Sequence, residues 1–174
     1  MRKTLILLSL LLMVFIVKAQ YKTFHKNIYG KFANYDNTEG KLEVELDSIL
    51  FTFEPDTENF WDFKAENKSK TKVSIDWQNA FIVVGKVGSP IVFGTDSRLL
   101  MNQPKQPEII LPDTYIKRKI DQKSNFEDSY TGRLFAKKYI KDGYEWHVKV
   151  TIPIIKNEIS KEYLFDIIIY NIKN

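Results

Sequence analysis

The sequence predicts an all-β fold, an antiparallel immunoglobulin-like sandwich of about eight or nine strands preceded by a signal peptide. Three observations predict it. Apolar and polar residues alternate with a period of two through most of the chain after Lys41, and turn signals separate the alternating runs. No segment sustains the 3.6-residue period of an amphipathic helix.

The first 19 residues have the pattern of a secretory signal peptide. Arg2 and Lys3 precede an uncharged stretch of 14 residues, 4–17, and Val17 and Ala19 stand at the −3 and −1 positions of a cleavage site. This stretch is shorter than the roughly 18 to 20 residues that a membrane-spanning helix needs. We therefore expect export to the periplasm or the extracellular space, with cleavage after Ala19 and no stable membrane anchor.

Charge and cysteine content restrict the function of the mature chain. Removal of Arg2, Lys3 and Lys18 leaves 23 of 26 basic residues against 22 acidic ones, so the net charge falls from +4 to near +1. A balance this close to zero does not indicate a nucleic-acid partner. The absence of cysteine excludes disulfides, thiol chemistry and the acylated cysteine of a lipoprotein. The 155 residues left after cleavage are enough for one domain held together by its core.

The chain divides into the signal peptide, an N-terminal segment at 20–40 and a β-sandwich domain at 41–174. Residues 20–40 lack a clean period, and they are predicted to form either a first strand or an N-terminal arm. Alternation then predicts strands over 41–46, 49–53, 61–66 and 72–77, the last two as a hairpin around the polar turn 67–70.

The next segments contain a short hairpin and a long loop. An apolar run at 80–84 precedes Gly85–Gly88, which we interpret as a hairpin turn, and a short strand follows at 91–93. Residues 95–114 lack a period and carry three prolines, so they predict a loop across an end or edge of the fold. A strand is expected near 115–120.

The last third has the clearest pattern. The Asp142-Gly143 pair predicts a hairpin turn. Apolar residues fall on one face of the run 144–154, while Glu145, His147 and Lys149 fall on the other. After a polar turn at 156–161, residues 163–172 are apolar on both faces apart from Asp166, which predicts a central or covered strand.

The residues that could carry catalysis do not form a recognisable set. His25 and His147 are far apart and lack further ligands at metal-binding spacing, and the sequence contains no Gly-x-Ser-x-Gly motif. The carboxylates that could supply a glycosidase pair are Asp62, Asp76 and Asp166. All three are expected within strands, and Asp166 is expected to pair with a lysine or a backbone donor, or to lie on a partly exposed face. We therefore predict no enzyme activity, no catalytic, cofactor-binding or metal-binding residues, and no cofactor.

Aromatic and basic residues allow two binding hypotheses. Trp61, Trp77 and Trp146 share faces with apolar residues and are expected in the core, which argues against a sugar-binding platform built from them. The aromatic residues left for a surface site are Tyr29, Phe32, Tyr35, Phe126, Tyr130 and Tyr139. The basic residues of a candidate polyanion patch are Lys117, Arg118, Lys119, Lys137 and Lys138. We favour the alternative that these basic residues protect an edge strand from aggregation.

Two segments carry a resemblance to known proteins. The hairpin-like stretch from Phe60-Trp61-Asp62-Phe63 through Ile75-Asp76-Trp77-Gln78-Asn79-Ala80, and the later Glu108-Ile109-Ile110-Leu111-Pro112, resemble a group of exported bacterial proteins. These are immunoglobulin-like β-sandwiches, often lipoproteins, without an assigned activity. The resemblance implies the sandwich fold and no functional residues, and the missing cysteine is a departure from the lipoprotein pattern.

The leading hypothesis is an exported, non-enzymatic β-sandwich with a binding or structural role in the bacterial envelope or outside the cell. Its partner would be another envelope protein or a glycan, bound by an edge strand or by the loop at 95–114. The alternatives are a carbohydrate-binding module that uses surface aromatics and an enzyme of unrecognised type.

Overall fold

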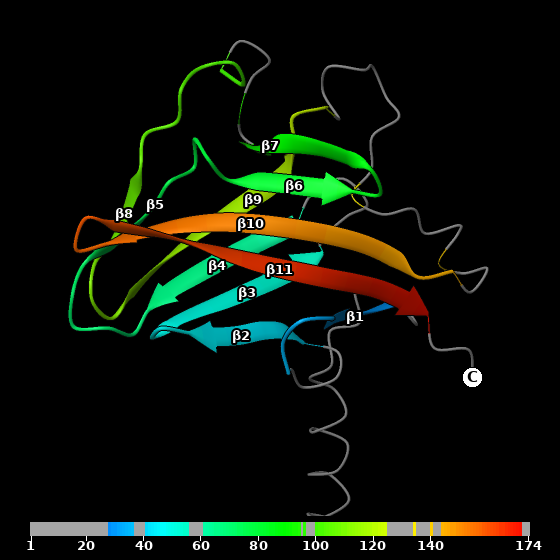
Figure 1. The fold of residues 1–174 in the computed structure, drawn as a ribbon, viewed down its shortest axis with the longest axis horizontal. Helices are drawn as coiled ribbons and strands as arrows, with labels where there is room; N and C mark the ends of the chain where they lie inside the picture. The colour runs from blue at the N-terminus through cyan, green and yellow to red at the C-terminus, as the bar shows by residue number, and fades with distance from the viewer. Residues whose placement is uncertain are drawn as a thin grey trace, which may run out of the picture.

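The computed structural model describes residues 28–36, 41–55, 61–94, 96, 100–124, 134, 140 and 144–171. All eleven elements of this part of the chain are β-strands, and every pairing between them is antiparallel (Figure 1). This confirms the all-β antiparallel prediction, although the predicted count of eight or nine strands is too low. The predicted signal peptide and the Asp142-Gly143 turn lie outside the described residues.

Three consecutive strands form the best-predicted part of the sheet. β2 (Leu42–Leu46), β3 (Ile49–Pro55) and β4 (Trp61–Asn67) pair in sequence order. Every second residue of β3 and β4 is buried, as the alternation predicts. The turn between β2 and β3 has two residues, both with positive φ, which is the backbone of a type I′ hairpin.

The predicted hairpin between β4 and β5 (Val73–Ile75) is wrong. β5 pairs with β10 and β8, whereas β4 pairs with β3 and β9. The buried Asn67 side chain explains the change of direction, because its amide donates to the carbonyl oxygens of Thr71 and Ile110 at 2.8 and 3.1 Å. The polar segment after β4 therefore crosses to another part of the sheet instead of reversing beside β4.

The predicted turn at Gly85–Gly88 is confirmed as a hairpin between β6 (Phe81–Val84) and β7 (Val87–Phe93). Gly85 has a φ of 61°, a left-handed conformation that glycine adopts without steric cost. β7 then pairs with the last residues of β9 (Thr114–Gln122). The long loop between β7 and β9 contains a three-residue strand, β8 (Glu108–Ile110), that the sequence did not predict.

The two longest strands are β10 (Trp146–Lys156) and β11 (Ile159–Asn171), joined by a two-residue turn at Asn157 and Glu158. β11 also pairs with β1 (Ile28–Phe32), so part of the segment 20–40 is a strand of the same sheet. β11 lies between β10 and β1, but its outer face is not covered throughout, since Leu164 is 45% exposed.

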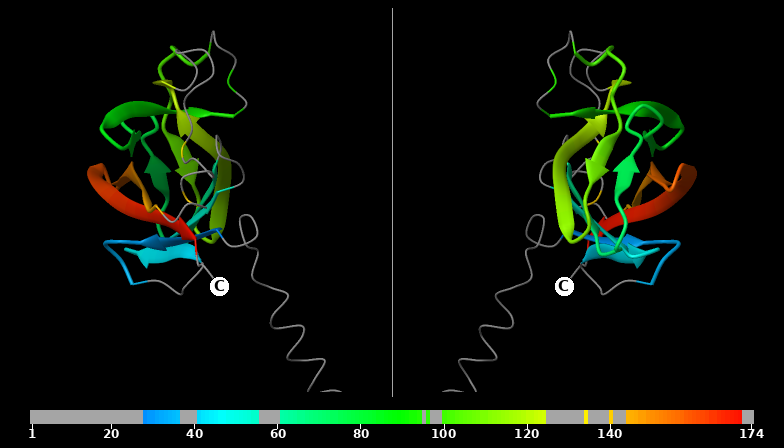
Figure 2. Two further views of the ribbon diagram at one scale, coloured as in Figure 1. Left: turned by 90° about the vertical axis from the view of Figure 1, so that its right-hand side faces the viewer. Right: turned by 90° about the vertical axis from the view of Figure 1, so that its left-hand side faces the viewer.

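The strands follow one path, β1-β11-β10-β6-β7-β9-β4-β3-β2, with β5 and β8 attached beside β10. Figure 2 shows this path curling around a common interior, so that the sheet is nearly closed and barrel-like. Its two terminal strands meet at a seam, where a side chain at Gly30 of β1 would collide with Leu42 of β2 at 2.9 Å. No register pairs β1 with β2 in the described residues.

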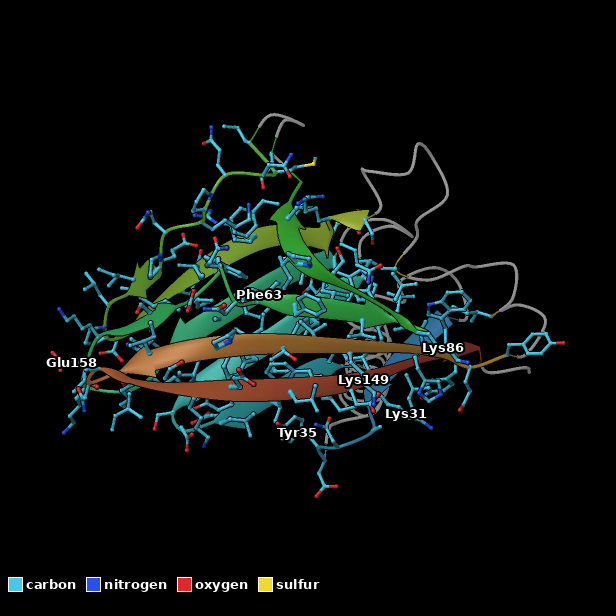
Figure 3. All side chains as sticks on the ribbon, turned by 45° about the horizontal axis from the view of Figure 1, so that its top comes forward. Lys31, Tyr35, Phe63, Lys86, Lys149 and Glu158 are labelled. Carbon is cyan, nitrogen blue, oxygen red and sulfur yellow. The ribbon has the colours of Figure 1, made fainter. Side chains whose placement is uncertain are left out.

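Aromatic rings fill the interior between the two sides of the sheet. Phe63 of β4, labelled in Figure 3, is fully buried. Phe165 of β11 lies 5.0 Å from Phe51 and 4.9 Å from Phe53, measured between ring centroids. These contacts join β11 to β3 across the barrel, and they explain how a cysteine-free chain holds both sides of the sheet together.

Candidate functional site

The loop between β7 and β8 folds back over the turn that follows β5 and rises above the sheet in Figure 1. The turn carries Trp77, which is only 2% exposed, and Gln78, whose Oε1 accepts a hydrogen bond from the backbone N–H of Lys105 at 2.9 Å. This bond spans 27 residues of sequence and ties the loop to the sheet. The predicted contact loop at 95–114 is therefore attached to the turn that also carries a buried tryptophan.

A half-open hollow of about 100 Å³ lies between this loop and β7. Its described lining is made of amide, apolar and lysine side chains: Trp77, Gln78, Pro90, Ile91, Met101, Asn102, Gln103, Lys105 and Lys123. These described lining residues include no carboxylate, imidazole or hydroxyl side chain. The hollow therefore offers hydrogen-bonding amides and two lysine side chains around an apolar floor.

A shielded ion pair fixes the wall of the hollow. The Lys105 ammonium lies 2.8 Å from Asp96 Oδ2, and the two side chains are only 12% and 14% exposed. The same carboxylate oxygen accepts the backbone N–H of Phe93 at 2.9 Å, and the Lys105 ammonium lies 4.7 Å from the Phe93 ring centroid. Because Asp96 neutralises Lys105, this lysine acts as a structural wall and not as a free cation.

Glu108 of β8 fixes the other end of the loop. One of its oxygens, Oε2, accepts from the Trp77 indole N–H at 2.9 Å and from Arg118 Nε at 3.2 Å, while Oε1 accepts from Arg118 Nη2. A forked arginine–carboxylate pair constrains both side chains in direction as well as in distance. The indole is thereby held in one orientation beneath the loop.

The volume of the hollow limits what it can bind. Pockets that enclose a complete small-molecule ligand usually measure about 300 to 1,000 Å³. A hollow of about 100 Å³ therefore admits one side chain or one end group of a larger molecule. Its geometry suits a partner that inserts a projecting group while the rest lies on the surrounding surface.

A second polar feature lies on the outer surface of β1, β11 and β10. We call it the outer-face charge row; its members are Lys31, Glu145, His147, Asp166 and Lys149. Glu145 lies 3.8 Å from Lys31 and 3.9 Å from His147. Figure 3 labels Lys31 on β1 and Lys149 on β10. Lys31 is opposite Ile168 of β11, which is in turn opposite His147, and Lys149 is opposite Asp166, so the row crosses all three strands.

The structure places the histidine and aspartate candidates in separate surroundings. Asp166 is half-buried and pairs with Lys149 at 3.5 Å on the adjacent strand, which confirms the expected lysine partner. Asp62 pairs with Lys117 at 2.8 Å on the other side of the sheet. Asp76 was expected within a strand, but it lies in the turn after β5, where it accepts from the backbone N–H of Gln78. His25 lies outside the described residues.

The tryptophans and the other aromatic candidates separate into core and surface. Trp61 and Trp77 are buried as predicted, and Trp146 is half-buried against the core. Phe32 was a surface candidate, but it is buried, and half-buried Tyr35 packs against it at 5.9 Å. Only Tyr29, among the described candidates, remains on the outer face. The other three, Phe126, Tyr130 and Tyr139, lie outside the described residues.

Lys117 and Arg118, two of the three basic candidates on β9 beside Lys119, form ion pairs within the protein. Lys117 binds Asp62 and Arg118 binds Glu108, while Lys137 and Lys138 lie outside the described residues. These residues were expected to protect an edge strand, and in the sheet order β9 lies between β4 and β7. The pairing of β9 with β7 begins only at Ile120, however, so the earlier residues of β9 pair with β4 alone. Lys117 and Arg118 lie in this part, which is paired on one side only.

The sequence pattern predicts the loop but not the residues that line the hollow. Gln78, Asn102, Gln103 and Lys105 carry no motif, and they come together only because the loop folds onto the turn after β5. The only local signal was a proline-bearing segment without a period. The hollow is therefore a product of tertiary structure.

No group of three or more histidine, aspartate or glutamate residues is placed to hold a metal ion in the part of the chain that the structure describes. Over the same residues, no helix has the length and apolar character needed to cross a bilayer.

Comparison with known proteins does not assign a family. No protein-family model matches the sequence, and no curated protein matches it. One solved structure, described as "Crystal structure of protein from Archaeoglobus fulgidus", is similar at 10% sequence identity with a TM-score of 0.34. The alignment covers 84% of this chain and 96% of that chain.

Proposed function

We propose that this chain is an exported, non-catalytic binding protein of the bacterial envelope or extracellular space, and that the loop hollow receives a projecting group of its partner. The described lining of the hollow carries this proposal, because it combines hydrogen-bonding amides with apolar side chains and contains no carboxylate, imidazole or hydroxyl side chain. The partner we favour is another envelope protein. Its inserted group would be uncharged and would hydrogen-bond to the amides.

Export and architecture complete the proposal. The signal-peptide pattern at residues 1–19 supports secretion with cleavage after Ala19. We also propose that the curled sheet is a variant of an immunoglobulin-like sandwich in which β7 connects the two layers. Its pairing with β6 on one side and β9 on the other supports this interpretation.

The test of the hollow compares two glutamines of the same loop. Gln103→Trp places a bulky ring where the hollow opens, whereas Gln106→Trp changes an exposed glutamine that does not line it. Each exported variant serves as bait for native envelope extract, and captured proteins are quantified by mass spectrometry. We expect the wild type and Gln106→Trp to capture the same partner and Gln103→Trp to lose it by at least about tenfold, equivalent to about 1.4 kcal/mol.

Two outcomes would contradict parts of this proposal separately. Equal capture by both variants would exclude the hollow as the binding site. A mature protein that still begins at Met1, shown by N-terminal sequencing of the envelope fraction, would instead exclude the cleaved signal peptide. Only the second result concerns localisation, so the two parts of the proposal can fail independently.

A further inference from the structure

Two tyrosine rings lie side by side on the outer surface of β1 and β11. Tyr29 and Tyr170 are direct register partners, and their ring centroids are 6.1 Å apart with an angle of 32° between the planes. The next residue of β1, Gly30, and the preceding residue of β11, Ile169, are buried on the interior side of the sheet. Since side chains alternate along a strand, both rings belong to the outer face. They are half-buried, so each ring retains an accessible surface.

The outer-face charge row continues directly from these rings. The Lys31 ammonium lies 5.1 Å from the Tyr170 ring centroid and 3.8 Å from Glu145. His147 follows Glu145 at 3.9 Å. Donors and acceptors therefore border an apolar ring surface, and the exposed side chains of Lys31, Glu145 and His147 can turn toward a bound molecule.

The charges of the row cancel. Lys31 and Lys149 balance Glu145 and Asp166, so the row has no net charge while His147 is neutral. Such a surface does not concentrate anions or cations. It favours a neutral ligand that carries many hydrogen-bonding groups.

One acceptor of the row is unsatisfied. Asp166 Oδ1 is buried and has no hydrogen-bond partner among the described residues, and the nearest ring nitrogen of His147 is 4.0 Å away. A buried acceptor without a donor costs free energy. His147 and Lys149 above it are about half exposed, so their side chains can shift to let a donor reach this oxygen.

We propose that this surface is a second binding site, distinct from the loop hollow, and that its ligand is a neutral glycan. A sugar ring has an apolar C–H face and a rim of hydroxyl groups. The C–H face would lie on Tyr29 and Tyr170, and the hydroxyls would bind the charge row beside them. Aromatic rings with polar edges suit this kind of amphipathic contact.

The experiment uses the exported protein and two neutral probes, cellohexaose and hexa-N-acetylchitohexaose, with alginate as a charged comparison. Binding is measured by isothermal titration calorimetry. We expect at least one neutral probe to bind, and we expect Tyr170→Ala and Tyr29→Ala to raise its Kd by at least about tenfold. Alginate should bind more weakly than the neutral probe.

Tyr115→Ala is the matched control. Tyr115 is an exposed tyrosine on β9, and the Lys64 ammonium lies over its ring at 4.7 Å, much as Lys31 lies over Tyr170. This variant should bind the neutral probe as the wild type does. The hollow variant Gln103→Trp should also leave glycan binding unchanged, which separates this proposal from the proposed function.

Three results would overturn the proposal. The first is that the wild type, shown to be folded by its circular dichroism spectrum, fails to bind either neutral probe. The second is that Tyr115→Ala reduces binding as much as Tyr170→Ala does. The third is that alginate binds more tightly than both neutral probes.

Discussion

At the scale of single residues, Asn67 shows how one buried side chain redirects the chain. Its amide nitrogen donates to two carbonyl oxygens, and its Oδ1 accepts from the backbone N–H and the hydroxyl of Ser69 at 2.9 and 2.7 Å. The residue is fully buried. All of its hydrogen-bonding groups are therefore used at the crossover from β4 to β5, where they replace the contacts that water would make.

We expect Asn67→Ala to lower the free energy of unfolding by about 3 kcal/mol, because it leaves buried carbonyl and amide groups without partners. Asn79→Ala is the control, since exposed Asn79 donates to Asp76 Oδ2 at 2.8 Å on the surface, and its loss should cost less than about 1 kcal/mol. Urea unfolding of both variants measures the difference. Equal losses would mean that the crossover does not depend on Asn67.

At the scale of elements, two hairpins use type I′ turns without glycine. Asn157 and Glu158 join β10 to β11 with φ values of 50° and 67°, and Asp47 and Ser48 join β2 to β3 in the same conformation. Asparagine and aspartate tolerate the left-handed region better than glutamate or serine does. The second position of each turn therefore carries the larger backbone cost.

Glu158→Gly should stabilise the protein by about 0.5 to 1 kcal/mol, because it creates the Asn-Gly pair that a type I′ turn prefers. Glu158 lies at the end of the β10–β11 hairpin in Figure 3. The same change at exposed Glu162, within β11, should instead destabilise by about 0.5 to 1 kcal/mol, since glycine weakens a strand. Thermal unfolding of the two variants should therefore shift in opposite directions, and a downward shift for Glu158→Gly would contradict the assigned turn.

The strands themselves could be predicted wherever one face is buried. The alternation in 42–46, 49–53 and 61–65 gave both the strands and their inward residues, because a two-residue period is a local property. The partners of β5 could not be predicted in this way. A polar turn signals that the chain changes direction, but only the buried bonds of Asn67 decide which strand comes next.

Short elements gave weaker signals. β8 has three residues within a proline-bearing loop, which is too few to show a period. The loop hollow was also beyond prediction, because Gln78 and Gln103 meet through a tertiary contact. The loop itself could be identified from its prolines alone.

At the scale of the whole molecule, side chains bridge the β2–β3 turn and β11. The Asp47 carboxylate accepts from Lys161 at 2.5 Å and from the Tyr163 hydroxyl at 2.6 Å. The Lys161 bond, followed by that of Tyr163, lowers the pKa of Asp47 below its ordinary value of 3.8. Burial, followed by the Asp47 bond, raises the pKa of Tyr163 above 10.0. Both shifts favour the bridge near neutral pH.

The two shifts predict losses of stability at opposite ends of the pH range. The contribution of Asp47 is present above pH 3.8 and is lost as the pH falls from there through its lower folded-state pKa. The contribution of Tyr163 is present below pH 10.0 and is lost as the pH rises through its higher folded-state pKa. We expect Asp47→Asn to reduce the pH dependence of the melting temperature at both ends.

Glu66→Gln separates this bridge from general carboxylate effects. The Lys64 bond lowers the pKa of Glu66, so its replacement should reduce the acid dependence only. Melting temperatures from pH 2 to pH 11 would be compared for the wild type and both variants. An alkaline profile of Asp47→Asn identical to that of the wild type would contradict the coupling between Asp47 and Tyr163.

The most direct test of the proposed binding role is photo-crosslinking in living cells. A benzophenone amino acid replaces Gln103 at the hollow or, as a control, Lys86 in the exposed β6–β7 turn. If the hollow receives a group of an envelope protein, irradiation should yield a discrete crosslinked adduct from position 103 and none from position 86. Adducts of equal yield from both positions, or no adduct from position 103 in correctly exported protein, would contradict the proposed binding role.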